Sequence, residues 1–319
     1  MVNKRDNWKA GIRDNLWMLV AILCTLFWGS GAPTIKLGYQ YFQLKSDDIF
    51  SILLFAGLRF FGAGCMTLVI GRLISGKWPR IYRRLIKPTI TMAMVQTVLQ
   101  YFFFYLGLTI VSGAAGVLLS STGTFFAVII AVIVGLEIMT GRKFAGIICG
   151  MAGVIVFNLS DNLELTFRWN GEFFILLTAI CYALHNILVK HYSKEHEPVA
   201  LTGFQFILGG AILCLIGIAG GGSLIWPGFG KSLILVYLMF QVAVAYGLWS
   251  LLLKRYDTSK VVIFNALTPI FGAIFSWLLL GDNIWRWNTL VALILIVLGI
   301  SLINWKRKFP APAVANPRP

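Results

Sequence analysis

Residues 49–71 read IFSILLFAGLRFFGAGCMTLVIG, an apolar stretch in which Arg59 is the one charged residue. A helix of roughly 20 residues crosses a bilayer core about 30 Å thick. The stretch shows no regular alternation of polar and apolar residues, which a strand of a membrane barrel would need. It therefore predicts a membrane-spanning helix, in which the backbone groups satisfy one another.

Apolar stretches of this kind recur along the whole chain. The predicted spans are 15–36, 49–71, 88–107, 112–135, 143–159, 170–190, 199–219, 232–253, 259–280 and 286–305. Of the 319 residues, 58% are hydrophobic and 12% are charged, whereas roughly a quarter are charged in an ordinary soluble domain. Only short loops and two tails remain, so no sizeable soluble domain fits. The predicted fold class is an all-α integral membrane protein with ten transmembrane helices.

The basic residues are distributed unevenly between the two sides of the predicted bundle. With the N-terminus in the cytoplasm, 21 of the 27 Lys and Arg residues lie inside, 5 lie outside, and Arg59 lies within a span. This split follows the positive-inside rule. It explains the net charge of +15 without a nucleic-acid partner, which would need a basic face on a soluble module. We expect a multi-pass protein of the cell (inner) membrane with two cytoplasmic tails, a basic one at 1–14 and a disordered one at 306–319.

The longest charged connection runs from Arg72 to Lys87 and carries six basic residues together with Trp78 and Pro79. Tryptophan and basic side chains gather at the interface between membrane and water. We therefore expect this connection to lie at the cytoplasmic headgroup level and to anchor the protein there.

The second half of the chain repeats features of the first at offsets of 145 to 154 residues. The matched positions keep their order across several spans: Gly57 and Gly203, Arg59 and Gln205, Gly64 and Gly210, Gln96 and Gln241, Tyr101 and Tyr246, Lys36 and Lys190. Five spans per copy is an odd number, so the repeats 15–159 and 170–305 are expected to be inverted relative to each other. Inverted repeats are typical of secondary transporters, although a duplicated bundle can also be purely structural.

Three groups of residues together resemble a known family. They are Trp28, Gly29, Ser30 and Lys36 in the first span, Leu58, Arg59 and Phe60 in the second, and Leu267, Thr268, Pro269, Leu280, Gly281 and Asp282 in the ninth. In this order the chain is similar to the EamA-type branch of the drug/metabolite transporter superfamily. The resemblance implies a ten-helix inverted repeat that moves small metabolites, often amino acids, out of the cell. The chain departs from the pattern at Thr124, where a proline would mirror Pro269, and at Asp282, where glutamate is commoner.

Polar side chains inside the predicted spans mark a candidate substrate pathway, because polar groups are costly in a bilayer. They fall on several helices at similar depth: Trp28, Gln96, Gln100, Tyr101, Tyr182, His185, Asn186, Gln241, Trp249 and Asn265. Such polar, aromatic-lined faces suit a central pocket for a small amphipathic solute. The alternative is that the same side chains hydrogen-bond between helices and hold them together.

Arg59, Pro33 and Pro269 are candidates for charge or helix-break roles. An arginine at the centre of a span costs roughly 2.5–3.5 kcal/mol. Arg59 can hold a substrate carboxylate or bind carbonyls at a helix end, and the structural role is favoured. Each proline frees the carbonyl four residues earlier, at Gly29 and Asn265. Broken helices near the midplane are where transporters hold substrate groups, although kinks also serve packing.

The distribution of acidic residues constrains the substrate. All 12 lie in tails, loops or helix ends, including Glu137, Glu172 and Asp282, so a permanent cation would lack a buried counter-charge. Neutral, zwitterionic or anionic substrates are therefore expected, with downhill movement or with coupling through His185. A buried core role is favoured for His185 over that of a proton carrier.

The predicted function is a secondary transporter, in the direction of export, of small neutral or zwitterionic metabolites such as amino acids, aromatic ones among them, by alternating access. The alternatives are a membrane-embedded enzyme and a non-transporting receptor or scaffold. An enzyme needs a nucleophile with a base or a metal cluster, and the His and Cys residues show no recognised ligand spacing. We expect no metal or cofactor, a monomer, and the lipid bilayer and a small solute as partners.

Overall fold

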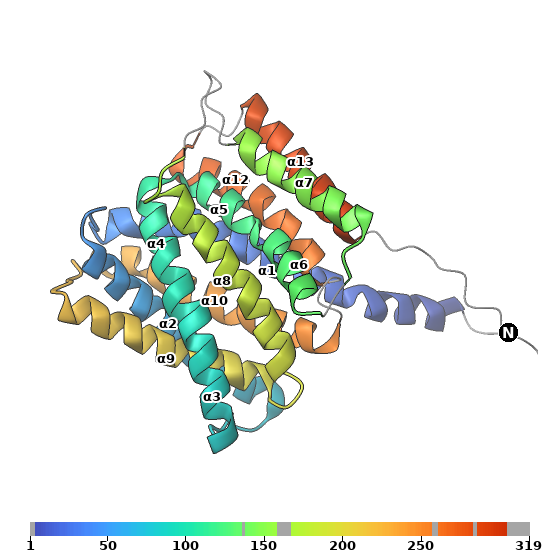
Figure 1. Cartoon of the computed structure of the whole chain (residues 1–319). Helices are drawn as coiled ribbons and strands as arrows, with labels where there is room; N and C mark the ends of the chain where they lie inside the picture. Colours follow the sequence, from blue (N-terminus) through green and yellow to red (C-terminus); the bar gives the residue numbers. More distant parts are fainter. Residues whose placement is uncertain (1–3, 136–137, 158–166, 257–260, 283–285, 305–319) are drawn as a thin grey trace, which may run out of the picture.

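The structure, a computed structural model, describes residues 4–135, 138–157, 167–256, 261–282 and 286–304. All regular secondary structure in these ranges is helical. The elements are α1 (Lys4–Tyr41), α2 (Ile49–Ser75), α3 (Arg83–Met92), η1 (Ala93–Gln100), α4 (Tyr101–Ile110), α5 (Gly113–Ser121), α6 (Gly123–Ile133), α7 (Gly141–Phe157), α8 (Glu172–Tyr192), α9 (Pro198–Ala219), α10 (Phe229–Arg255), η2 (Ile263–Ala266), α12 (Leu267–Leu280) and α13 (Trp287–Asn304). They form one helical bundle (Figure 1), which confirms the all-helical prediction.

Seven helical segments of the described residues are long and apolar enough to cross a membrane: Leu16–Tyr41, Ile49–Ser75, Arg83–Ile110, Ala115–Ile133, Glu172–Tyr192, Pro198–Ala219 and Phe229–Arg255. The predicted spans 143–159, 259–280 and 286–305 coincide with the shorter helices α7, α12 and α13. Ten crossings in a 5+5 arrangement therefore remain a prediction. Helix α1 begins at Lys4, so most of the predicted basic tail is helical. The tail 306–319 and Glu137 lie outside the described residues.

Two pairs of helices that are distant in the sequence pack together at the borders of the bundle, α2 with α9 and α7 with α13 (Figure 1). Between them, α1 packs against α10 and α12. Helix α8 makes the corresponding contacts with η1, α4 and α6. Helices α1 and α8, which begin the two sequence repeats, are therefore the central elements of the bundle.

Glycines allow the backbones of α2 and α9 to touch. A Cβ atom built at Gly57 would lie 2.8 Å from the carbonyl oxygen of Gly210, and one built at Gly64 would lie 2.7 Å from that of Gly203. Small residues permit this close approach in membrane helices. Because residue numbers rise along α2 where they fall along α9, the two helices run antiparallel.

The pair formed by α7 and α13 is built in the same way. A Cβ atom at Gly153 would lie 2.9 Å from the carbonyl oxygen of Ala292, and one at Gly299 would lie 2.5 Å from that of Gly146. Residue numbers again run in opposite senses along the two helices. Both pairs that join the sequence repeats are therefore antiparallel.

The third predicted span is one continuous run of α3, η1 and α4, and its central part is a π-helix. The π-helical stretch carries Gln96 and Gln100, two of the predicted pathway residues. Short π-helical segments inside α-helices are frequent at functional sites. The π-helical geometry and the polar residues thus indicate the same segment as part of a functional site.

The fourth and ninth spans are both interrupted, although only the ninth contains a proline. Ser120, Ser121 and Thr122 donate hydrogen bonds to the carbonyls three residues earlier, at 2.9, 2.6 and 2.6 Å. Such bonds compete with the helical pattern, and α5 ends at Ser121 before α6 begins at Gly123. In the ninth span the 3-10 turn η2 directly precedes α12, which contains Pro269. The fourth span is therefore interrupted even though Thr124 stands where a proline would mirror Pro269.

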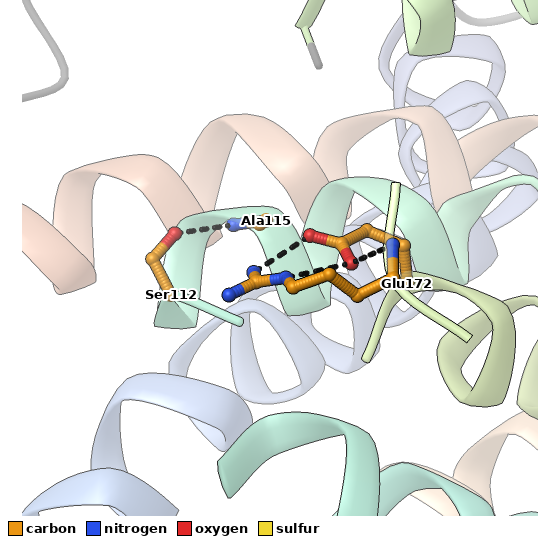
Figure 2. Close-up of polar contacts among 4 residues, drawn as sticks. Ser112, Ala115 and Glu172 are labelled. Atoms are coloured by element: carbon orange, nitrogen blue, oxygen red, sulfur yellow. Dashed lines mark hydrogen bonds and ion pairs between the residues drawn. The ribbon is translucent and has the colours of Figure 1, made fainter. Parts of the chain in front are cut away.

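Helices α5 and α8 begin near each other (Figure 2). Ser112 caps α5 by accepting a hydrogen bond from the amide of Ala115 at 3.1 Å. Glu172, the first residue of α8, is paired with Arg168 at 2.8 Å. A carboxylate at a helix N-terminus also interacts favourably with the helix dipole. Glu172 thus serves a helix end, where the sequence placed it.

Candidate functional site

A cavity of about 80 Å³ lies at the centre of the bundle, among α1, α2, η1, α4, α5, α8, α10 and the η2–α12 segment. A single water molecule needs roughly 10–15 Å³ of such space, so the cavity can hold several waters or one small solute. Seven residues singled out from the sequence line it: Trp28, Arg59, Gln100, Tyr101, Tyr182, Gln241 and Asn265. The lining also contains residues outside that set: Gly31, Ala32, Ile35, Phe104, Val117, Ser120, Ser121, Thr178, Tyr246 and Thr268.

Arg59 is 3% exposed and makes three hydrogen bonds to neutral groups. Its Nη1 donates to the Tyr105 hydroxyl at 2.9 Å, its Nη2 to Gln241 Oε1 at 2.9 Å and its Nε to the Leu238 carbonyl at 3.4 Å. A guanidinium carries five N–H donors, and no carboxylate pairs with this one among the described residues. Arg59 thus brings an uncompensated positive charge and spare donors to the cavity.

The Arg59–Gln241 contact has a counterpart in the other half of the chain. Gln205 aligns with Arg59 in the sequence repeat, and Gln96 aligns with Gln241. Gln205 Nε2 donates to Gln96 Oε1 at 2.5 Å, while Arg59 Nη2 donates to Gln241 Oε1 at 2.9 Å. The two halves therefore make equivalent side-chain contacts, but only one of the two pairs is charged.

Three polar atoms of the cavity lining are buried without a hydrogen-bond partner among the described residues. They are Trp28 Nε1, Gln100 Oε1 and Tyr182 Oη. A buried polar group left unpaired costs about 1–3 kcal/mol. Gln96 Nε2, Gln205 Oε1 and both ring nitrogens of His185 are unpaired as well, in residues behind the lining. Together the three atoms of the lining offer one donor, one acceptor and one hydroxyl that can do either.

Aromatic rings gather around Trp28, with Tyr182 and Tyr246 in the cavity lining and Trp249 behind it. The ring centroid of Trp28 lies 6.0 Å from that of Tyr182, 5.0 Å from that of Tyr246 and 4.6 Å from that of Trp249. The Tyr246 and Tyr101 hydroxyls are hydrogen-bonded at 2.6 Å. Tyr246 lines the cavity but is not among the residues predicted from the sequence. Its match to Tyr101 in the sequence repeat could have identified it.

We expect Tyr101→Phe to lower the melting temperature of the detergent-solubilised protein by about 2–4 °C, because one buried hydrogen bond contributes about 1 kcal/mol. Tyr246→Phe removes the same bond and should have a similar effect. The double variant should be less destabilised than the sum of the two single variants. Strictly additive melting temperatures would contradict this contact.

Four predicted pathway residues do not line the cavity but lie behind its lining: Gln96, His185, Asn186 and Trp249. Asn186 accepts a hydrogen bond from Trp249 Nε1 at 3.1 Å and donates to the Tyr182 carbonyl at 2.8 Å. Gln96 is held by Gln205, and His185 lies edge-on to Tyr246 with ring centroids 6.1 Å apart. These side chains support the residues that face the cavity.

The two prolines lie on neighbouring helices, Pro33 inside α1 and Pro269 inside α12. Beside Pro269, Asn265 Oδ1 accepts a hydrogen bond from the Thr268 hydroxyl at 2.9 Å, and its Nδ2 donates to Thr124 Oγ1 at 3.2 Å. Thr124, where the sequence departs from the family pattern, thus links the interrupted spans of the two halves.

The polar cluster at the centre of the bundle does not have the composition of a metal site. Within the described residues no group of three or more His, Cys, Asp or Glu side chains is placed to hold a metal ion. The five cysteines, all of them in described segments, are free thiols. The polar groups of the centre are amides, hydroxyls, indoles and one guanidinium, which suit recognition of an organic solute.

Comparisons with known proteins agree on the class of protein. A relative named as an uncharacterized transporter, YoaV of Bacillus subtilis (strain 168), is 23% identical over 286 residues, which cover 89% of this chain and 94% of the relative. The S-adenosylmethionine/S-adenosylhomocysteine transporter of Chlamydia trachomatis serovar L2 is 23% identical and is covered over 72% of its length. A chloroplastic WAT1-related protein of Arabidopsis thaliana is 27% identical over 204 residues. The match covers 61% of this chain but only 48% of that protein, so this chain spans about half of its length.

A solved crystal structure also superimposes on this fold. Its TM-score is 0.67 at 18% sequence identity, and the match covers 90% of this chain and 96% of that one. At this level of identity the likeness shows the fold alone. The sequence profile of the EamA-like transporter family matches residues 15–159 and 169–305, so the chain belongs to that family and is a multi-pass membrane protein.

Proposed function

We propose that the protein is a secondary transporter, in the direction of export, of small neutral or zwitterionic metabolites such as amino acids. The observation that carries this proposal is the central cavity of about 80 Å³, whose lining includes the charged Arg59 and three residues that each have an unpaired buried polar atom. A solute in this space would supply the missing partners.

The arrangement of the two halves supports an inverted repeat of five helices each. The matched helices α2 and α9 are antiparallel, as are α7 and α13. An axis that exchanges antiparallel helices lies perpendicular to them and hence in the plane of the membrane. The equivalent contacts Arg59–Gln241 and Gln205–Gln96 fit the same relation. Transporters of this architecture place substrate between the halves.

Within the proposed class, the chemistry of the lining favours zwitterionic solutes, which carry an anionic group. Of the described residues that line the cavity, Arg59 alone is charged. A carboxylate can accept its spare N–H donors, and Gln100 Oε1 and the Tyr182 hydroxyl can accept hydrogen bonds from an ammonium group. Trp28 and Tyr246 offer apolar surface for a side chain. The Chlamydia relative, named for S-adenosylmethionine and S-adenosylhomocysteine, extends the candidates to derivatives of amino acids.

Alternating access requires that the two halves exchange conformations. The matched lysines Lys36 and Lys190 already make different contacts. Lys190 at the end of α8 donates to the carbonyls of Leu253 and Tyr256, both at 3.0 Å, and so ties α8 to α10. Its repeat partner Lys36 instead lies within electrostatic range of Asp282. We infer that the two matched ends of the bundle are held by different contacts in this state.

A counterflow experiment tests the proposal. Full-length protein in proteoliposomes preloaded with one unlabelled amino acid should accumulate the same labelled amino acid, above vesicles without protein. The panel should include aromatic, aliphatic and sulfur-containing amino acids. Recovery of unaltered label separates transport from a membrane-embedded enzyme. Folded protein that moves no member of the panel would favour a receptor or scaffold.

A further inference from the structure

A second cavity, of about 670 Å³, lies at the end of the bundle where α2 ends and α9 begins. It is bordered by the connection between α2 and α3 and by Leu251 of α10. Its lining includes Arg72, Lys77, Arg80, Trp78 and Glu197. The cavity is separate from the central one, and none of these residues lines both.

The connection that borders this cavity is held in place at both of its ends. Gly76 adopts a left-handed conformation (φ 72°), and its amide donates to the Arg72 carbonyl at 2.9 Å, which turns the chain back at the end of α2. The hydroxyl of Tyr82, just before α3, is hydrogen-bonded to His196 Nδ1 at 2.7 Å. The connection that borders the cavity is therefore tied to α2 at one end and to the segment before α9 at the other.

The positive charges of this cavity are not neutralised within the described residues. No carboxylate forms an ion pair with Arg72, Lys77 or Arg80 there. The one acidic residue of the lining, Glu197, caps α9 by accepting a hydrogen bond from the Ala200 amide at 2.5 Å. Three cations thus border a space that holds a single, already engaged carboxylate, and Arg72 also donates a hydrogen bond to the Gly76 carbonyl. The net positive charge of this lining attracts an anion.

Apolar side chains continue from the charged cavity along the outer face of α2. Leu73 is 79% exposed and Ile74 is 66% exposed, and Trp78 beside them is 60% exposed. Large apolar side chains exposed in a membrane protein face acyl chains, and tryptophan prefers the interface. A soluble anion would use the cations alone, whereas an amphipathic anion would use both surfaces.

We propose that this cavity is a binding site for an anionic phospholipid. Its phosphate lies among Lys77, Arg80 and Arg72, and its acyl chains run along Leu73 and Ile74. Basic pockets between membrane helices bind anionic headgroups in this way. The site stabilises the connection between α2 and α3, and it is independent of the proposed transport function.

Native mass spectrometry of the full chain in detergent tests the site, with titrations of phosphatidylglycerol, phosphatidylcholine and inorganic phosphate. The double variant Lys77→Gln/Arg80→Gln removes two exposed cations of the lining. The control, Arg142→Gln/Arg286→Gln, removes two exposed arginines at the starts of α7 and α13, away from the cavity. We expect the first variant to bind phosphatidylglycerol about thirty-fold more weakly, given the usual contribution of each basic residue, and the control to match the wild type.

The titrations also distinguish the source of the phosphate. Wild-type protein should prefer phosphatidylglycerol to phosphatidylcholine, and millimolar inorganic phosphate should not displace the lipid. Equal retention of phosphatidylglycerol by the two double variants would overturn the site. Displacement of the lipid by an equimolar amount of inorganic phosphate would replace the proposed lipid by a soluble anion.

Discussion

Arg59→Gln is expected to reduce the flux of solutes that carry a carboxylate by about a hundredfold. A hydrogen bond to a charged group contributes about 1.5–3 kcal/mol, and two such bonds to one carboxylate exceed the roughly 2.7 kcal/mol that corresponds to a factor of a hundred. The substitution also removes the one charge from the described cavity lining. Initial rates of counterflow in proteoliposomes measure the effect.

The chemistry of the solute separates recognition from a structural role of Arg59. If Arg59 binds a carboxylate, the amide of the same amino acid should move at a similar rate through the wild type and the variant. If Arg59 only ties α2 to Tyr105, Gln241 and Leu238, both solutes should be lost together. Arg59→Lys should fall between these limits, because a lysine keeps the charge but not the forked donors. Arg255→Gln, at the exposed end of α10, is the matched control and should transport normally.

Hydropathy predicted the helices because the bilayer sets their length and excludes charge. Each predicted span coincides with helical structure in the described residues. Hydropathy could not predict the π-helical stretch from Ala93 to Gln100, the interruption at Thr122 or the 3-10 turn η2. These differ from an α-helix in hydrogen-bond register and not in composition. The hydroxyl run Ser120, Ser121 and Thr122 was the available signal for one of them.

The depth of a polar residue in the membrane can be predicted from the sequence, but the direction of its side chain cannot. Gln100, Tyr182 and Gln241 line the central cavity, and their role as a substrate pathway stays a prediction. His185 and Asn186 lie at the same level but behind the lining, since sequence spacing does not fix how a helix is rotated against its neighbours. The role of Arg59 as a substrate contact stays a prediction. The structure adds that it both binds neighbouring helices and faces the cavity.

Gly210→Ala is expected to prevent assembly of the bundle or to lower its melting temperature strongly. A Cβ atom at position 210 would collide with the backbone amide of Phe61 and would lie 2.8 Å from the Gly57 carbonyl oxygen. Backbone atoms cannot move aside as the end of a side chain can, so α2 and α9 must separate. The measurements are the yield of monodisperse protein and its melting temperature.

The glycine contacts also predict the order in which neighbouring substitutions act. Gly57→Ala should be as severe as Gly210→Ala, since its Cβ would lie 2.5 Å from the Cys214 amide. Gly203→Ala should be milder, because its nearest neighbour is the flexible end of Leu68. Gly230→Ala, near the start of α10 with open space around it, should be tolerated. Since α2 and α9 join the two repeats, equal tolerance of all four variants would contradict the close backbone contact on which the arrangement of the halves depends.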